Sequence, residues 1–138
     1  MTMSRDAKLM AGITILVVPT IMYGGWTLLG ILTQGTVGPA SAGLKLTDTQ
    51  WALWRAGHAH AGVWTVFSIL LQVLLDSTRL SAGLVWLARI CAPVSAVALS
   101  GGFFGLAFSP SFRLLLYLGI CTLLIALLTT AVGLLRSR

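Results

Sequence analysis

Apolar residues run along the chain in four long stretches that hold almost no charge, and polar residues gather between these stretches. A helix needs about 20 apolar residues to cross the hydrocarbon core of a bilayer. The pattern therefore predicts four membrane-spanning helices, at about 10–32, 51–75, 84–108 and 112–135. We expect an all-α fold, an integral membrane four-helix bundle that forms a single transmembrane domain over residues 1–138.

The ends of the predicted helices carry capping residues. The sequence Thr47-Asp48-Thr49-Gln50 has the spacing of a capping box and should begin the second helix. Ser109-Pro110 supplies an N-cap and a first-turn proline for the fourth helix. Prolines inside the first and third stretches, Pro19 and Pro93, predict kinks in those helices.

The composition supports a membrane location. Of the 138 residues, 57% are hydrophobic and 9% are charged, and the mean hydropathy is +0.96. A soluble domain carries about 25% charged residues. The chain therefore lacks the polar residues that would cover a water-soluble globule, and we expect the lipid bilayer to surround it.

The net charge of +6 indicates membrane orientation and not nucleic-acid binding. The basic residues are scattered between apolar runs and form no stripe that could follow a phosphate backbone. Most of them lie at the two termini and in the 76–80 turn, which the positive-inside rule places in the cytoplasm. We expect a multi-pass protein of the inner (plasma) membrane with the 33–50 loop outside. Arg89, near the inner end of the third helix, should snorkel to the membrane surface.

Both histidines of the chain, His58 and His60, lie in one short segment about a third of the way into the second helix. Ionisable residues at this depth are costly and usually mark a functional site, although a neutral histidine can also bond a neighbouring helix. The two side chains should point about 160° apart, so they cannot bind one small metal ion together. His58 shares a polar face with Arg55 and Thr65, whereas His60 lies on an apolar, aromatic face.

The residues around the histidines indicate a flat and wide ligand. Gly57 and Gly62, with the alanines between them, remove side-chain bulk beside both imidazoles. A haem macrocycle needs such clearance, and histidine is a common axial ligand of haem iron. Arg55 lies one turn toward the outer surface and is a candidate partner for a haem propionate. Trp54, next to it, is a further candidate cofactor contact.

Three segments of the chain resemble the styrene oxide isomerase family of four-helix membrane proteins. They are Met10-Ala11-Gly12 with Gly24 and Trp26, then Trp54–His58 or Ala59–Gly62, and then Gly102-Phe103-Phe104 leading to Phe108-Ser109-Pro110. The resemblance implies a homotrimer that binds haem b through one histidine. In that family the ferric iron acts as a Lewis acid on a small hydrophobic epoxide, which opens with a hydride shift to an aldehyde.

The resemblance fits either histidine as the iron ligand, and from the sequence we favour His60. The pattern Ala59-His60-Ala61-Gly62 favours His60, whereas the spacing from Trp54 favours His58. The family also has an Asn about six residues after the ligand, and Trp64 or Val66 stands there in this chain.

The family places a Tyr beside the substrate where this chain has Phe103 or Phe104. We take Phe103, together with Thr65 on the face of His58, as candidate catalytic residues. The alternative function is a non-enzymatic haem-binding protein or an accessory subunit of a respiratory membrane complex, in which both histidines bind haem iron.

Overall fold

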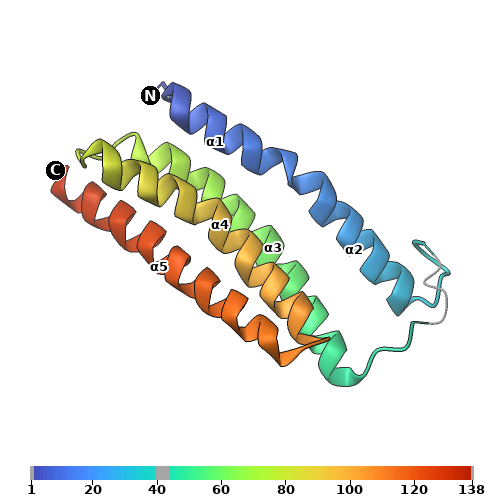
Figure 1. The fold of residues 1–138 in the computed structure, drawn as a ribbon. Helices are drawn as coiled ribbons and strands as arrows, with labels where there is room; N and C mark the ends of the chain where they lie inside the picture. The colour runs from blue at the N-terminus through green and yellow to red at the C-terminus, as the bar shows by residue number, and fades with distance from the viewer. Residues whose placement is uncertain (1, 40–43, 138) are drawn as a thin grey trace.

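The computed structural model describes residues 2–39 and 44–137, and within these ranges it contains helices and no strands. The helices are α1 (Arg5–Leu16), α2 (Val18–Leu32), α3 (Asp48–Leu75), α4 (Ala82–Leu106), the short 3₁₀ helix η1 (Pro110–Phe112) and α5 (Arg113–Arg136). Figure 1 shows α3, α4 and α5 side by side, with α1 and α2 following one another along the same bundle. The predicted all-α fold is confirmed.

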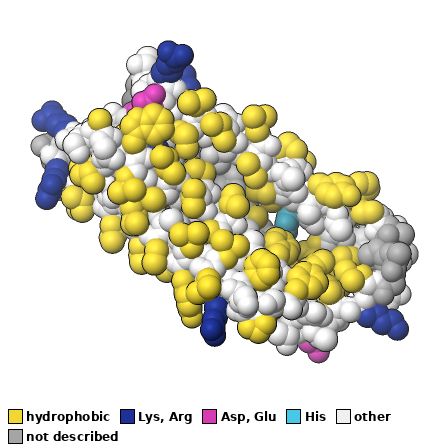
Figure 2. Space-filling view, in the orientation of Figure 1, with side chains coloured by type: hydrophobic (Ala, Val, Ile, Leu, Met, Phe, Trp, Pro, Cys, Tyr) yellow, Lys and Arg dark blue, Asp and Glu magenta, His cyan; other side chains and the backbone are white. Residues whose placement is uncertain are grey.

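Within the described residues, four helical segments are long and apolar enough to cross a membrane. They are Arg5–Leu32, which joins α1 and α2, and Asp48–Leu75, Ala82–Leu106 and Pro110–Arg136. These segments match the four predicted spans to within about five residues at each end. The N-terminus, the C-terminus and the α3–α4 turn lie at one end of the bundle, as four crossings require (Figure 1). Figure 2 shows basic side chains toward the two ends and apolar side chains over the middle.

The helices α3 and η1 begin at the capping residues that the sequence predicted. The Thr47 side chain accepts a hydrogen bond from the backbone nitrogen of Gln50, and the Gln50 side chain accepts one from the backbone nitrogen of Thr47. This completes the predicted capping box at the start of α3. The Ser109 hydroxyl accepts from the backbone nitrogen of Ser111, so Ser109 caps η1, and α5 follows directly.

The two interior prolines have different effects on their helices. The first span is interrupted at Val17, and Pro19 lies in the first turn of α2. The helix α4, in contrast, runs through Pro93 without a break in its assignment. Because Pro93 has no N–H, the carbonyl of Arg89 one turn earlier loses its usual helical partner. That carbonyl instead accepts a hydrogen bond of 3.1 Å from Gln72 Nε2 on α3.

Small residues allow α4 to lie close to α3 and α5. The best-buried apolar cluster contains Leu71 of α3, Cys91 and Ala92 of α4, and Ala126 of α5. A Cβ atom on Gly119 of α5 would lie 2.8 Å from the backbone nitrogen of Leu99 on α4, so this approach requires glycine. The helices α3, α4 and α5 therefore form the compact part of the bundle.

A set of hydrogen-bonded side chains, which we call the polar clamp, joins α1, α3 and α4 at the end that holds both termini. It consists of Ser4, Gln72, Asp76 and Arg89. Arg89 Nη2 lies 2.5 Å from Asp76 Oδ1, with the two side chains 3% and 11% exposed. Asp76 also accepts hydrogen bonds of 2.7 Å from the backbone nitrogen and the hydroxyl of Ser4.

The polar clamp corrects the prediction for Arg89. The guanidinium does not snorkel, because Asp76 neutralises it inside the bundle and Gln72 accepts from its Nη1 through two oxygens at 3.1 and 3.2 Å. Arg89 lies near the helix end that the sequence predicted, but its side chain turns inward.

Candidate histidine site

His58 projects from α3 toward α2, where it meets a glycine. A Cβ atom on Gly25 would lie 2.8 Å from Cε1 and 2.9 Å from Nε2 of His58. Any larger residue at position 25 would push either the imidazole or α2 away. Gly25 therefore sets how closely α2 can approach the histidine.

A cavity of about 550 Å³ opens beside His58 between α2 and α3. Its other lining residues are apolar or small: Ile21, Ala59, Gly62, Val63, Val66 and Phe67. A Cβ atom on Gly62 would meet no atom within 4 Å, so this glycine borders open space. Within the described part of the chain, His58 has no hydrogen-bond partner. The cavity thus presents one imidazole in an apolar surrounding.

His60 has a different environment, on the side of α3 that faces α4. Its Nδ1 lies 2.7 Å from the carbonyl oxygen of Ala56, one turn earlier. A carbonyl can only accept, so Nδ1 carries a proton, and in the neutral form of this ring Nε2 keeps its lone pair. The His60 ring also packs against the ring of Phe103, with 4.6 Å between the centroids. The prediction that the two histidines face different neighbours is confirmed.

Figure 2 shows a histidine side chain at the surface of the bundle, among apolar groups. Both imidazoles are partly exposed. Neither is enclosed by this chain alone.

The other predicted cofactor contacts lie apart from the cavity. Gly57 is buried, and a Cβ atom there would lie 3.0 Å from the ring of Phe104, so Gly57 serves the contact between α3 and α4. Trp54 packs edge-on against the same Phe104 ring, with 6.0 Å between centroids. Arg55 is exposed and lines a smaller hollow of about 340 Å³ together with Leu32.

The two candidate catalytic residues are also separated. Phe103 contacts His60, whereas Thr65 lies in a second cavity that shares no lining residue with that of His58. The structure thus brings His60 together with Phe103, and Gly62 together with His58. It does not gather all the predicted site residues around one point.

Sequence reasoning missed the contribution of α2. Ile21 and Gly25 form the wall opposite His58, and neither was a candidate. The adjacent glycines Gly24 and Gly25, in an otherwise bulky apolar helix, were the available signal, because glycine in a membrane helix often marks a close contact.

Comparison with protein-family models, curated proteins and solved structures finds no match to this chain. Among the described residues, no group of three or more His, Cys, Asp or Glu side chains could hold a metal ion. A haem needs only one or two axial ligands from the protein, and a single exposed imidazole is sufficient for that role.

Proposed function

We propose that this chain is a membrane haem b protein in which His58 is the axial ligand of the iron, and that it isomerises a small hydrophobic epoxide to an aldehyde. The observation that supports this function is the cavity beside His58. It combines an imidazole that makes no hydrogen bond to any described residue with walls of hydrocarbon side chains.

The residues around this cavity suit a flat macrocycle. Gly62 and the exposed Ala59 have little or no side chain, so they leave room for a ring beside the imidazole. Val63 and Phe67 offer apolar contact to a porphyrin. Arg55, one turn toward the start of α3, is exposed and can offer its guanidinium to a propionate. The cavity volume of about 550 Å³ lies in the usual range of small-molecule sites.

Bound ferric haem would supply a Lewis-acid centre for a neutral oxygen. The side chains of this chain would hold the iron through His58 and exclude water through Ile21, Val66 and Phe67. In the isomerisation one C–O bond of the epoxide breaks, a hydride moves to the neighbouring carbon and a carbonyl forms, so no proton enters or leaves. A wall without acids or bases beyond His58, as the described lining residues provide, is compatible with this chemistry.

The open side of the cavity supports an oligomer. The first span, Arg5–Leu32, is the least buried of the four: only 11% of its most apolar 18-residue stretch is buried inside the bundle. We infer, in line with the family resemblance, a homotrimer in the inner (plasma) membrane in which a neighbouring copy covers this side. Both termini would face the cytoplasm, because the basic residues concentrate at that end.

His60 supports a second candidate function. Its Nδ1–H bond to the Ala56 carbonyl leaves Nε2 free, which is the arrangement common among metal-ligating histidines. If both histidines bound haem iron, the protein would be a non-enzymatic haem protein or an accessory subunit of a respiratory complex.

Absorption spectra of the purified full-length protein with added haem, in wild type, His58→Ala and His60→Ala, test the two functions. We expect His58→Ala to lose the Soret band and His60→Ala to keep it with a high-spin ferric spectrum. Wild type should also convert styrene oxide to an aldehyde. A six-coordinate, reducible haem that needs both histidines would support the second function, and no Soret band in wild type would refute both.

A further inference from the structure

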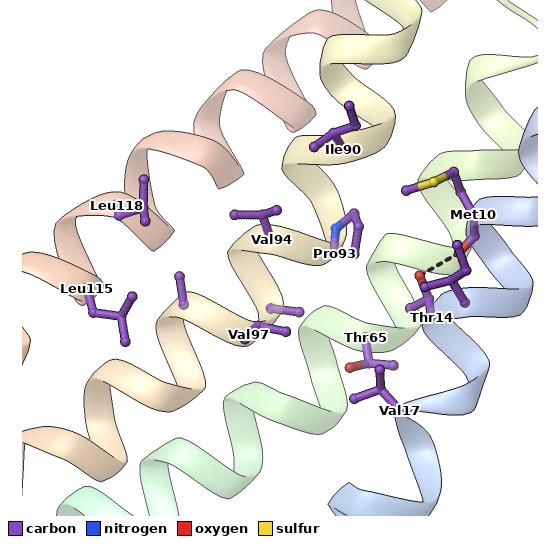
Figure 3. Close-up of a pocket in the computed structure, with 13 residues that line it drawn as sticks. Met10, Thr14, Val17, Thr65, Ile90, Pro93, Val94, Val97, Leu115 and Leu118 are labelled. Carbon is purple, nitrogen blue, oxygen red and sulfur yellow. Dashed lines mark hydrogen bonds between the residues drawn. The ribbon is translucent and has the colours of Figure 1, made fainter.

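A second cavity lies between α1 and α5, and α4 forms its floor. Its volume is about 410 Å³. Figure 3 shows Met10 and Thr14 of α1 and Val17, which follows α1, on one side and Leu115 and Leu118 of α5 on the other. Thr65 of α3, the helix that Figure 3 draws between α4 and α1, lines the same space. We call this cavity the α1–α5 groove.

The α1–α5 groove is apolar except for hydroxyl groups. The hydroxyl of Thr14 is already used, because it donates to the Met10 carbonyl at 2.7 Å, the dashed line in Figure 3. No charged side chain is among its described lining residues, so a charged ligand would lose its hydration without compensation.

Thr65 differs from most of the other buried hydroxyl residues. The hydroxyl groups of four buried residues each donate to a carbonyl three or four residues earlier in the same helix: Thr14, Ser95, Ser100 and Thr130. Thr65 is 4% exposed and has no hydrogen-bond partner among residues 2–39 and 44–137. In Figure 3 its hydroxyl oxygen lies on the side toward Val97 of α4. Ser68 is unpaired too, but it does not line the groove.

From this we propose that the α1–α5 groove binds a small neutral molecule that is mostly hydrocarbon and carries one oxygen acceptor, such as a ketone or an ether. The Thr65 hydroxyl would donate a hydrogen bond to that oxygen, and the apolar walls would hold the hydrocarbon part. This site is independent of haem and of either histidine.

The depth of Thr65 argues against a lipid as the ligand. Thr65 lies 10 residues before the end of α3 at Leu75 and 17 after its start at Asp48. At a rise of 1.5 Å per residue it is therefore about 15 Å or more from either helix end. The ester oxygens of a lipid lie at the membrane surface, and its acyl chains have no acceptor at this depth.

Fluorine NMR titration of the full-length protein in nanodiscs tests the site with two matched probes. These are para-fluoroacetophenone and para-fluoroethylbenzene, which differ chiefly in the carbonyl oxygen. We expect saturable binding of both, with the ketone about fivefold tighter, as one neutral hydrogen bond implies. Thr65→Val should abolish that preference and Thr65→Ser should keep it.

A second variant tests the position of the site. Val97→Trp should fill the α1–α5 groove and remove saturable binding of both probes, whereas Val66→Trp, in the cavity of His58, should not. Circular dichroism checks that each variant keeps its helices. The proposal fails if wild type binds both probes equally, if binding is unsaturable, or if Thr65→Val retains the preference. Because no haem is added, these outcomes are separate from those for the proposed function.

Discussion

At the end of the bundle that holds both termini, Ser4, Asp76 and Arg89 join α1, α3 and α4 through hydrogen bonds of 2.5 to 2.7 Å. Nearer the middle, α2 meets α3 where Gly25 faces the imidazole of His58, which makes no hydrogen bond to any described residue. The first region pairs its buried polar groups except Arg89 Nε, and the second leaves its ionisable group unpaired beside an open cavity.

This contrast indicates which region stabilises the fold and which region can bind a ligand. A paired, buried polar group fixes the positions of the helices that carry it, whereas an unpaired one in an apolar surrounding gains from a ligand. We therefore expect substitutions in the polar clamp to lower the free energy of unfolding and substitutions in the His58 cavity to change ligand binding instead.

The largest effect should come from Arg89→Ala. This change leaves the Asp76 carboxylate buried without its cation and should lower the free energy of unfolding by about 3 kcal/mol. SDS-induced unfolding in mixed micelles, followed by circular dichroism, measures the loss. Arg136→Ala, an exposed basic residue at the end of α5, is the matched control and should have little effect. Equal stability of the two variants would show that the polar clamp does not hold the bundle together.

The next largest change in stability should come from replacing a glycine at a close helix contact, and a glycine beside open space provides the comparison. A Cβ atom on Gly133 of α5 would lie 2.9 Å from Cβ of Thr78, so Gly133→Ala should lower the free energy of unfolding by about 2 kcal/mol. Gly62→Ala meets open space and should raise it by about 0.5 kcal/mol, because alanine favours the helix. The same unfolding assay measures both. A large loss in Gly62→Ala would mean that the His58 cavity is filled in the native protein.

The sequence predicted the fold more completely than the site. Helix length and hydropathy depend on local composition, and the capping box at Thr47 and Gln50 is a local signal as well, so these predictions are confirmed. The direction of the Arg89 side chain depends on Asp76 and Gln72, which lie on another helix. Periodicity along one helix contains no information about such a partner.

The candidate site shows the same limit. Helix geometry alone placed His58 and His60 on different faces. It grouped Thr65 with His58, because the two share a stripe of α3, but in the bundle α2 meets the stripe at His58, and α1 and α4 meet it at Thr65. Residues on one stripe therefore reach different cavities, and only the arrangement of the other helices decides which.

Smaller losses of stability should follow from removing the N-caps of α1 and α3. Thr47→Ala removes the capping box of α3 and should lower the free energy of unfolding by about 1 kcal/mol. Ser4→Ala removes the cap of α1 and also the 2.7 Å hydrogen bond to Asp76, so about 1.5 kcal/mol is expected. Thr27→Ala, whose hydroxyl donates only to the Tyr23 carbonyl one turn earlier in α2, serves as the control. If Ser4→Ala costs less than Thr47→Ala, the bond between Ser4 and Asp76 adds nothing to the cap.

The smallest effect is the response of the polar clamp to acid. Burial alone would raise the pKa of the Asp76 carboxyl, but hydrogen bonds from Ser4 and the hydrogen bond and charge of Arg89 bring that pKa below its ordinary value of 3.8. A lowered pKa in the folded state means that Asp76 stabilises the fold above pH 3.8, and that this contribution is lost as the pH falls below it.

The free energy of unfolding should thus decline from about pH 4 downward in wild type and decline less in Asp76→Asn, which has no carboxyl to protonate. The loss is modest because a protonated Asp76 can still accept hydrogen bonds from Ser4. Parallel curves for the two proteins would mean that carboxylates other than Asp76, such as Asp6 and Asp48, cause the acid response.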